Sequence, residues 1–128
     1  MKVGIDIIEI ERIKKLYEKF GNRFLSRIFT ENEINYCFSR KNYFHSLAGR
    51  FAIKEAVLKA LEIGMTSGFS FKDIEVLNIN KGKPIVILYG KLKEMLGNRK
   101  IEISISHSEN YAVGICIIYK EWSKLLFQ

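Results

Sequence analysis

The sequence predicts a single α+β domain in which a mostly antiparallel sheet packs on one long buried helix. Apolar residues cover most of the helical circumference over residues 46–61, as expected for a helix that is buried on nearly all sides. In the second half of the chain the period of the apolar residues changes to two, which is typical of half-buried strands. The length of 128 residues, without a linker or repeat, indicates one domain over 1–128.

A strand and an amphipathic helix are expected at the start of the chain. Residues 3–10 are rich in β-branched side chains and predict a buried strand, in which Asp6 is the unusual member. Apolar residues then recur at the spacing of one helical face: Ile13, Leu16, Tyr17 and Phe20. Gly21 stops this pattern, as a glycine at a helix C-terminus does.

Two further helices are expected before the middle of the chain. Thr30 and Glu33 match a capping box, in which each side chain accepts a hydrogen bond from the other residue's backbone N–H, and they predict a short helix over 31–38. A loop is expected over 39–46. The long buried helix follows over 46–61 and gives way to a connection that contains glycine, serine and threonine.

Two hairpins separated by a short helix are expected in the second half. Alternating apolar and polar residues predict the strands, and turn-forming residues separate the members of each pair. The expected elements are strands at 74–79 and 84–89, a helix at 91–96, and strands at 101–106 and 111–119. The tail, residues 122–128, is expected to pack or to associate.

The composition excludes several classes of protein. Hydrophobic residues at 48% and charged residues at 27% are those of a globular protein rather than of a disordered or fibrous one. No segment approaches the ~20 apolar residues of a membrane span, and Asp6 and Glu9 interrupt the segment that a signal peptide would need. We therefore expect a cytoplasmic protein without a membrane partner. Cys37 and Cys116 lack ligand spacing, so we expect reduced core thiols rather than a zinc site.

The basic character of the chain favours a polyanionic partner. The formal net charge is +7 and the pI is near 9.4, so nucleic acid, a phosphorylated cofactor and an acidic protein all qualify. The densest basic cluster lies on the first predicted helix and indicates a docking face: Arg12, Lys14, Lys15 and Lys19.

Two carboxylates stand among apolar neighbours. Asp6 is flanked by isoleucines in the first strand, and Glu55 lies in the long helix. Two carboxylates with phosphate oxygens and waters commonly hold Mg²⁺. The residues leave open the alternative that a nearby Lys or Arg neutralises each carboxylate, including an ordinary i,i+4 pair of Glu55 with Lys59 on a solvated face.

Basic residues on the same helix point to a phosphorylated ligand. They would give the site excess positive charge, which suits a diphosphate or polyphosphate: Arg50, Lys54 and Lys59. His107 follows a strand between two serines, so it can donate to phosphate or serve as a hydrogen-bonding turn residue. His45 is expected to be a surface or loop residue.

Four motifs occur in a characteristic order and spacing. They are residues 4–10 with Arg12 and Ile13, residues 49–56 with Lys59 and Ala60, residues 82–84, and residues 106–108 with Tyr111 and Ala112. Together they resemble the holo-[acyl-carrier-protein] synthases, the short, single-domain group of 4′-phosphopantetheinyl transferases, over residues 4–118. One departure is clear, because the family usually has a glycine-threonine-glycine turn where this chain has residues 61–65 and keeps only Gly64.

The resemblance implies a Mg²⁺-dependent transfer of 4′-phosphopantetheine from coenzyme A to a serine of apo-acyl carrier protein. It implies that adenosine 3′,5′-bisphosphate is released, and that a homotrimer has its active sites between subunits. Asp6 and Glu55 would hold the metal, and Glu55 would also help to deprotonate the serine. Lys59 would neutralise charge on the pyrophosphate.

The resemblance also implies two sets of binding residues. The set for coenzyme A, to which the charge argument adds Lys54 and Lys59, is Arg50, Gly82, Lys83, Pro84, His107 and Ser108. The set for carrier docking, to which the basic cluster adds Lys15, is Arg12, Leu16, Arg23, Phe24 and Arg27.

Two alternatives come from other functional classes. A nucleic-acid-binding module would account for the high pI and the aromatic residues, but no such motif is recognisable and we expect no nucleic acid partner. Another Mg²⁺ enzyme, such as a phosphohydrolase, would use the same carboxylate pair but needs further ligands. The choice between Mg²⁺ and Mn²⁺ stays open.

Overall fold

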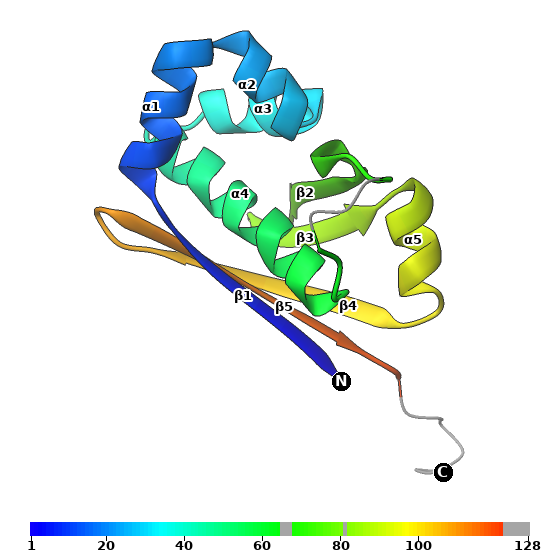
Figure 1. Cartoon of the computed structure of the whole chain (residues 1–128). Coiled ribbons are helices and arrows are strands. Elements are labelled where there is room, and N and C mark those ends of the chain that lie inside the picture. Colours follow the sequence, from blue (N-terminus) through cyan, green and yellow to red (C-terminus); the bar gives the residue numbers. More distant parts are fainter. Residues whose placement is uncertain (65–67, 81, 122–128) are drawn as a thin grey trace.

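The computed structural model describes residues 1–64, 68–80 and 82–121 of the chain (Figure 1). The elements in order are β1 (Lys2–Glu9), α1 (Ile10–Phe20), α2 (Asn22–Ile28), α3 (Glu31–Phe38), α4 (Tyr43–Ala60), a 3-10 turn η1 (Phe71–Asp73), β2 (Ile74–Ile79), β3 (Lys83–Leu88), α5 (Gly90–Leu96), β4 (Lys100–His107) and β5 (Tyr111–Tyr119). Residues 122–128, expected to pack or to associate, lie outside the described residues.

The helix α4 lies across one face of a three-stranded sheet of order β1-β5-β4 (Figure 1). Both strand pairs in this sheet are antiparallel, as is the separate β2-β3 pair. Helices α1 and α3 and strand β2 also contact α4, which is therefore enclosed by the rest of the domain. The predicted α+β fold, with antiparallel strands packed on a long buried helix, is confirmed.

Two glycines allow α4 to approach the sheet backbone closely. A Cβ on Gly4 of β1 would lie 1.9 Å from the backbone oxygen of Ala56, and one on Gly114 of β5 would lie 2.7 Å from the backbone nitrogen of Ile53. Both contacts are with backbone atoms, which no side-chain rotation can relieve. The distance between α4 and strands β1 and β5 is therefore set by the absence of side chains at these two positions.

Gly4→Ala is expected to lower the free energy of unfolding by about 2 kcal/mol or more, because the added methyl group overlaps the Ala56 carbonyl. Urea unfolding followed by circular dichroism measures the change. Gly64→Ala is the matched control, since a Cβ there meets no described atom within 4 Å. A loss for Gly4→Ala no larger than that for Gly64→Ala would show that the helix and strand separate without cost.

The local signals for helix ends are confirmed. Gly21 ends α1 with a φ of 55°, in the left-handed region that favours glycine. The Thr30 and Glu33 capping box begins α3 as expected. Both cysteines are buried free thiols, and burial raises the pKa of Cys37 to about 11. Within the described ranges, the longest apolar helix falls short of what a membrane crossing requires.

The long helix begins earlier than its sequence pattern predicts. The expected loop over 39–46 is too long, because α4 starts at Tyr43. Its first turn is held by aromatic packing: the ring of Tyr43 stacks on Phe38 at 5.0 Å, and that of Phe44 lies 5.8 Å from Tyr17. The preceding Asn42 is of a residue type favoured at the N-cap, but its side chain makes no capping hydrogen bond here.

The departure from the family turn has a visible backbone consequence. Glu62 adopts a φ of 60°, the left-handed conformation that glycine accepts at least cost. Its carboxylate lies 2.8 Å from the Lys2 ammonium, and both groups are exposed. The chain therefore has a left-handed residue at this position that is not a glycine.

Candidate active site

Asp6, Glu55 and Lys59 meet where β1 passes α4. The Lys59 ammonium nitrogen lies 3.1 Å from Asp6 Oδ1 and donates a second hydrogen bond, 3.0 Å long, to the Ile5 carbonyl. The Asp6 side chain is 18% exposed and that of Lys59 is 55% exposed, so the lysine lies on the solvent side of the pair. The i,i+4 pair of Glu55 with Lys59 is thus not what the structure shows, because Lys59 bonds to Asp6 instead. The alternative that a nearby lysine neutralises the carboxylate is confirmed for Asp6.

The half-buried carboxylate of Glu55 is destabilised in its charged form. Burial raises the pKa of Glu55, the nearby Asp6 carboxylate raises it further, and Lys59 and Arg12 oppose the shift. A bound cation would relieve this repulsion, so the pair suits a divalent metal. In the described part of the chain, no three or more His, Cys, Asp or Glu side chains lie together in an arrangement that could hold a metal ion. The protein would therefore supply two ligands there, and substrate oxygens or waters the rest.

A second polar cluster lies near the N-terminal half of α4. Arg50 donates to Asn78 Oδ1, and the Asn78 amide donates to the Gly82 carbonyl over 2.8 Å. Asn78 thereby ties Arg50 to the turn that carries Gly82. Burial lowers the pKa of His107, and the nearby His45 and Arg50 lower it further. Asn78 was missed from the sequence because a single amide in an alternating strand has no distinctive pattern.

The two clusters lie on opposite edges of the sheet. Asp6 belongs to β1 and His107 to β4, and β5 runs between these strands. Two strand spacings separate the edges by roughly 10 Å. One chain therefore brings together Asp6, Glu55 and Lys59 on one flank of α4, and Arg50, Gly82 and His107 on the other.

The remaining predicted nucleotide residues lie in or beside turns. Lys83 and Pro84 begin β3, directly after Gly82. Ser108 follows β4, where its hydroxyl accepts a 3.2 Å hydrogen bond from the Tyr111 backbone and so shapes the hairpin turn.

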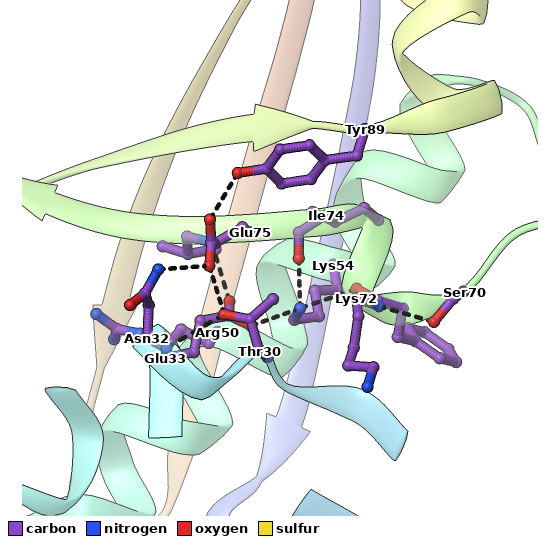
Figure 2. Close-up of polar contacts among 12 residues, drawn as sticks. Thr30, Asn32, Glu33, Arg50, Lys54, Ser70, Lys72, Ile74, Glu75 and Tyr89 are labelled. Atoms are coloured by element: carbon purple, nitrogen blue, oxygen red, sulfur yellow. Dashed lines mark hydrogen bonds and ion pairs between the residues drawn. The ribbon is translucent and has the colours of Figure 1, made fainter. Parts of the chain in front are cut away.

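The prediction that Lys54 contacts coenzyme A is wrong. Its side chain is fully buried, and its ammonium donates to the Glu33 carboxylate at 2.8 Å, to the Phe71 carbonyl at 2.9 Å and to the Ile74 carbonyl (Figure 2). These three acceptors use all three donors of an ammonium group. Lys54 is adjacent to Glu55 in sequence, but consecutive helical residues point about 100° apart. It therefore faces α3 and β2 rather than Asp6.

This buried lysine belongs to a network that joins four elements. Besides binding Lys54, Glu33 accepts hydrogen bonds from the Thr30 and Val76 backbones, each 2.9 Å long. The Thr30 hydroxyl in turn donates to Glu75, which also accepts a hydrogen bond from Tyr89 (Figure 2). The network fixes α3, β2 and the start of α5 against α4.

The predicted docking residues line two adjoining grooves that share Leu16. The first, of about 620 Å³, is lined by Leu16, Phe20, Arg23, Phe24, Ser26, Arg27, Ser70 and Lys72. The second, of about 520 Å³, is lined by Ile7, Ile8, Glu9, Glu11, Arg12, Lys15, Leu16 and Lys19. Arg12 also acts on the Glu55 carboxylate, so the second groove leads to the acidic pair. The sequence did not predict Lys72 as part of the first groove, because η1 is far from α1 and α2 in the chain and lies beside them only in the folded protein.

Known proteins are similar to this chain in sequence and in fold. The profile of the 4′-phosphopantetheinyl transferase superfamily matches residues 2–116. The chain belongs to this superfamily. A holo-[acyl-carrier-protein] synthase of Thermodesulfovibrio yellowstonii is 52% identical over 116 residues, which cover 91% of this chain and 96% of that protein. One of Protochlamydia amoebophila is 49% identical, with 90% and 94% covered.

Solved structures of this superfamily have the same architecture. The holo-[acyl-carrier-protein] synthase of Helicobacter pylori in complex with coenzyme A matches with a TM-score of 0.82 and 34% identity, and 91% of this chain and 98% of that one are covered. The Bacillus anthracis enzyme in complex with coenzyme A (3′,5′-ADP) matches at 0.78 and 40%, with 94% and 96% covered. The predicted family, fold and enzyme class are confirmed, and these relatives favour a transferase over a nucleic-acid-binding module.

Proposed function

We infer that this chain transfers 4′-phosphopantetheine from coenzyme A to a serine of apo-acyl carrier protein and releases adenosine 3′,5′-bisphosphate. The observation that carries this inference is the meeting of Asp6, Glu55 and Lys59 at the end of a basic groove. Relatives that are about half identical over most of the chain are named for the same reaction.

Asp6 and Glu55 would hold Mg²⁺, as their closeness and the raised pKa of Glu55 support. When bound, the metal would neutralise charge on the pyrophosphate as the bond to phosphorus breaks. Because the Lys59 side chain is exposed, its ammonium group would move from Asp6 to the oxygens of the pyrophosphate. The Glu55 carboxylate would accept the serine proton directly or through water. The transfer depends mainly on positioning and charge neutralisation, which these groups on one rigid helix supply.

The nucleotide end of coenzyme A is assigned to the second cluster. Arg50 and His107 supply donors for phosphate, and the turn of Gly82, Lys83 and Pro84 lies beside them through Asn78. Arg50 is nearly buried and stacks its guanidinium over Tyr36 at 4.4 Å, so its position is fixed before a ligand arrives.

A homotrimer with active sites between subunits accounts for two features. The two clusters lie on opposite flanks of one chain, and association of copies would bring one cluster of each chain beside the other cluster of its neighbour. The sheet face turned away from α4 is also uncovered by described elements (Figure 1) and carries six aliphatic side chains on adjacent strands. They are Val3, Ile5, Ile7, Val113, Ile115 and Ile117, and the first three are more than half exposed. Such a face is typical of an interface between copies.

One assay tests the proposed function. Purified protein with Mg²⁺, coenzyme A and an apo-acyl carrier protein should add about 340 Da to the carrier, the mass of the transferred group in this metal-assisted reaction. Mass spectrometry of the intact carrier measures the shift, and addition of EDTA should remove it. An unchanged mass with a carrier that another transferase modifies would contradict the proposal. A cytoplasmic location stays a prediction.

Arg12→Glu and Lys15→Glu, alone or together, are expected to raise the KM for the carrier about tenfold, because acyl carrier proteins are acidic and both residues line the second groove. The salt dependence of kcat/KM should weaken, while the KM for coenzyme A stays unchanged. Steady-state kinetics at two ionic strengths measure both effects. Lys93→Glu, on the exposed surface of α5, is the charge-matched control. Equal effects of Lys93→Glu would mean that net charge, rather than this groove, attracts the carrier.

A further inference from the structure

His45 lies against His107, although the sequence gives it only a surface or loop role. It belongs to the first turn of α4. The two imidazole rings have centroids 6.1 Å apart and planes at 82°, so the edge of one ring faces the other. The Nε2 atom of His45 lies 3.0 Å from the Glu109 carbonyl oxygen, in the turn that follows His107. His45 therefore connects α4 to the hairpin that carries His107.

The absence of a side chain at Gly49 brings the two histidines together. Gly49 lies one helical turn after His45, and a Cβ there would lie 2.9 Å from Ile105 Cγ2 and 3.8 Å from His107 Cδ2. The end of β4 therefore lies directly on α4. His107 lies against the helix at Gly49 and beside the His45 ring, and it is exposed to solvent.

The hydrogen bond of His45 fixes the state of its ring. A carbonyl oxygen only accepts hydrogen bonds, so Nε2 carries the proton and donates to Glu109. In the neutral ring Nδ1 is then an acceptor, and a proton gained by the ring goes to Nδ1. Protonation thus leaves the contact with the turn intact and adds one positive charge beside His107.

Arg50 adds a permanent positive charge to this pair. Its side chain is 4% exposed, and its Nε has no hydrogen-bond partner among the described residues. Together with burial, His45 and Arg50 lower the pKa of His107. The cluster thus holds two imidazoles and a guanidinium, and the Glu109 backbone contributes only a carbonyl. An unpaired buried N–H and mutually repelling cationic groups both favour a bound anion.

We propose that His45 is a positioning residue of the nucleotide-phosphate site, which holds His107 in place and takes up a proton when a phosphate group binds. This inference rests on the proposed function, because coenzyme A supplies the phosphate. The chemistry required is a phosphate oxyanion, and coenzyme A offers it as a 3′-phosphate monoester and as a pyrophosphate.

Proton uptake predicts the direction in which the phosphate affinity changes with pH. In the free protein, burial and the neighbouring His45 and Arg50 lower the pKa of His107. A bound phosphate favours the protonated form of a nearby imidazole, so the affinity for phosphate should rise as the pH falls. Binding should take up a larger number of protons when both histidines are present than when one is replaced.

The test uses the full chain and adenosine 3′,5′-bisphosphate as the probe. Titration calorimetry at pH 6 and pH 8, in buffers with different ionisation heats, gives the dissociation constant and the number of protons taken up. His45→Gln is expected to weaken binding about tenfold at pH 6, as for a lost charge-assisted contact, and less at pH 8. It should also lower the number of protons taken up on binding.

A comparison of ligands identifies the phosphate group. If coenzyme A shows the effect of His45→Gln and 3′-dephospho-coenzyme A does not, the two histidines bind the 3′-phosphate. If both ligands show the effect, they bind the pyrophosphate. Equal affinity and proton uptake for His45→Gln and the unaltered protein, with either ligand, would overturn the proposal.

A measurement on the unaltered protein avoids any effect of the substitution on folding. The chain contains two histidines, His45 and His107, so an NMR titration of the imidazole signals follows only these two rings. Adding the probe should raise the pKa of both rings, and a shift of one ring alone would contradict a shared role. Carrier modification by the unaltered protein is assayed separately. Transfer without a histidine effect would therefore refute only this inference and leave the proposed function standing.

Discussion

Glu55→Gln should reduce the transfer rate about a thousandfold or more while the protein stays folded. The substitution keeps the size of the side chain but removes one of two carboxylates that would hold the metal, together with the group that would accept the serine proton. The half-buried Glu55 carboxylate is destabilised by burial and by Asp6, so its loss should not lower the melting temperature. Carrier mass spectrometry and thermal unfolding measure the two properties. Full activity of Glu55→Gln would show that the metal assignment is wrong.

Mixing two inactive variants tests where the site is completed. Glu55→Gln damages the cluster on the β1 side of α4, and His107→Ala damages the cluster on the β4 side. If each active site combines the β1-side cluster of one subunit with the β4-side cluster of its neighbour, subunit exchange in an equal mixture restores some sites. Each cluster in a site is intact with a probability of one half, so about a quarter of the sites contain two intact clusters. Activity should then return toward that fraction. If activity stayed absent after proven exchange, each chain would have to complete its own site.

Lys54→Met should lower the free energy of unfolding by about 3 to 5 kcal/mol, because it leaves the Glu33 carboxylate buried without its cation. Methionine matches the length of the lysine stem, so the loss reports the ammonium and its three acceptors rather than a cavity. Burial lowers the pKa of Lys54, and the Glu33 carboxylate opposes that shift. The pair therefore stabilises the fold mainly because each charge compensates the other.

Urea unfolding of Lys54→Met and Lys59→Met separates stability from chemistry. The Lys59 side chain is 55% exposed, so its removal should change the stability by less than about 1 kcal/mol while transfer is lost. The double variant Lys54→Met/Glu33→Gln should recover part of the stability lost in Lys54→Met, since no buried carboxylate remains unpaired. Similar stability of Lys54→Met and the unaltered protein would mean that Glu33 is compensated by its two backbone donors alone.

The sequence predicts short-range structure well where a residue and its partner are close in the chain. Thr30 and Glu33 are three residues apart, so their capping box and the helix that follows could be read directly. The ion pair of Glu33 with Lys54 could not be predicted in this way, because the two residues are 21 positions apart and no local pattern marks such a pair. The start of α4 was also missed, because side chains from α1 and α3 hold its first turn.

The same distinction applies to the candidate site. Asp6 and Glu55 were conspicuous because each interrupts an apolar segment, and the family motifs indicated that they act together. Lys54 was misplaced because proximity in sequence to Glu55 does not give the same direction on a helix. Asn78 and His45 act through partners on other elements, and their local sequence gives no sign of this.

The glycine at position 4 gives a different meaning to the first of the motifs by which this family is recognised. Gly4 holds α4 close to β1, and Asp6 and Glu55 extend from those same two backbones. The separation between the two carboxylates is therefore fixed by a residue that bears no functional group. Any larger residue at position 4 would widen this carboxylate pair, so the affinity and selectivity of the proposed metal site would depend on a backbone contact as much as on the carboxylates themselves.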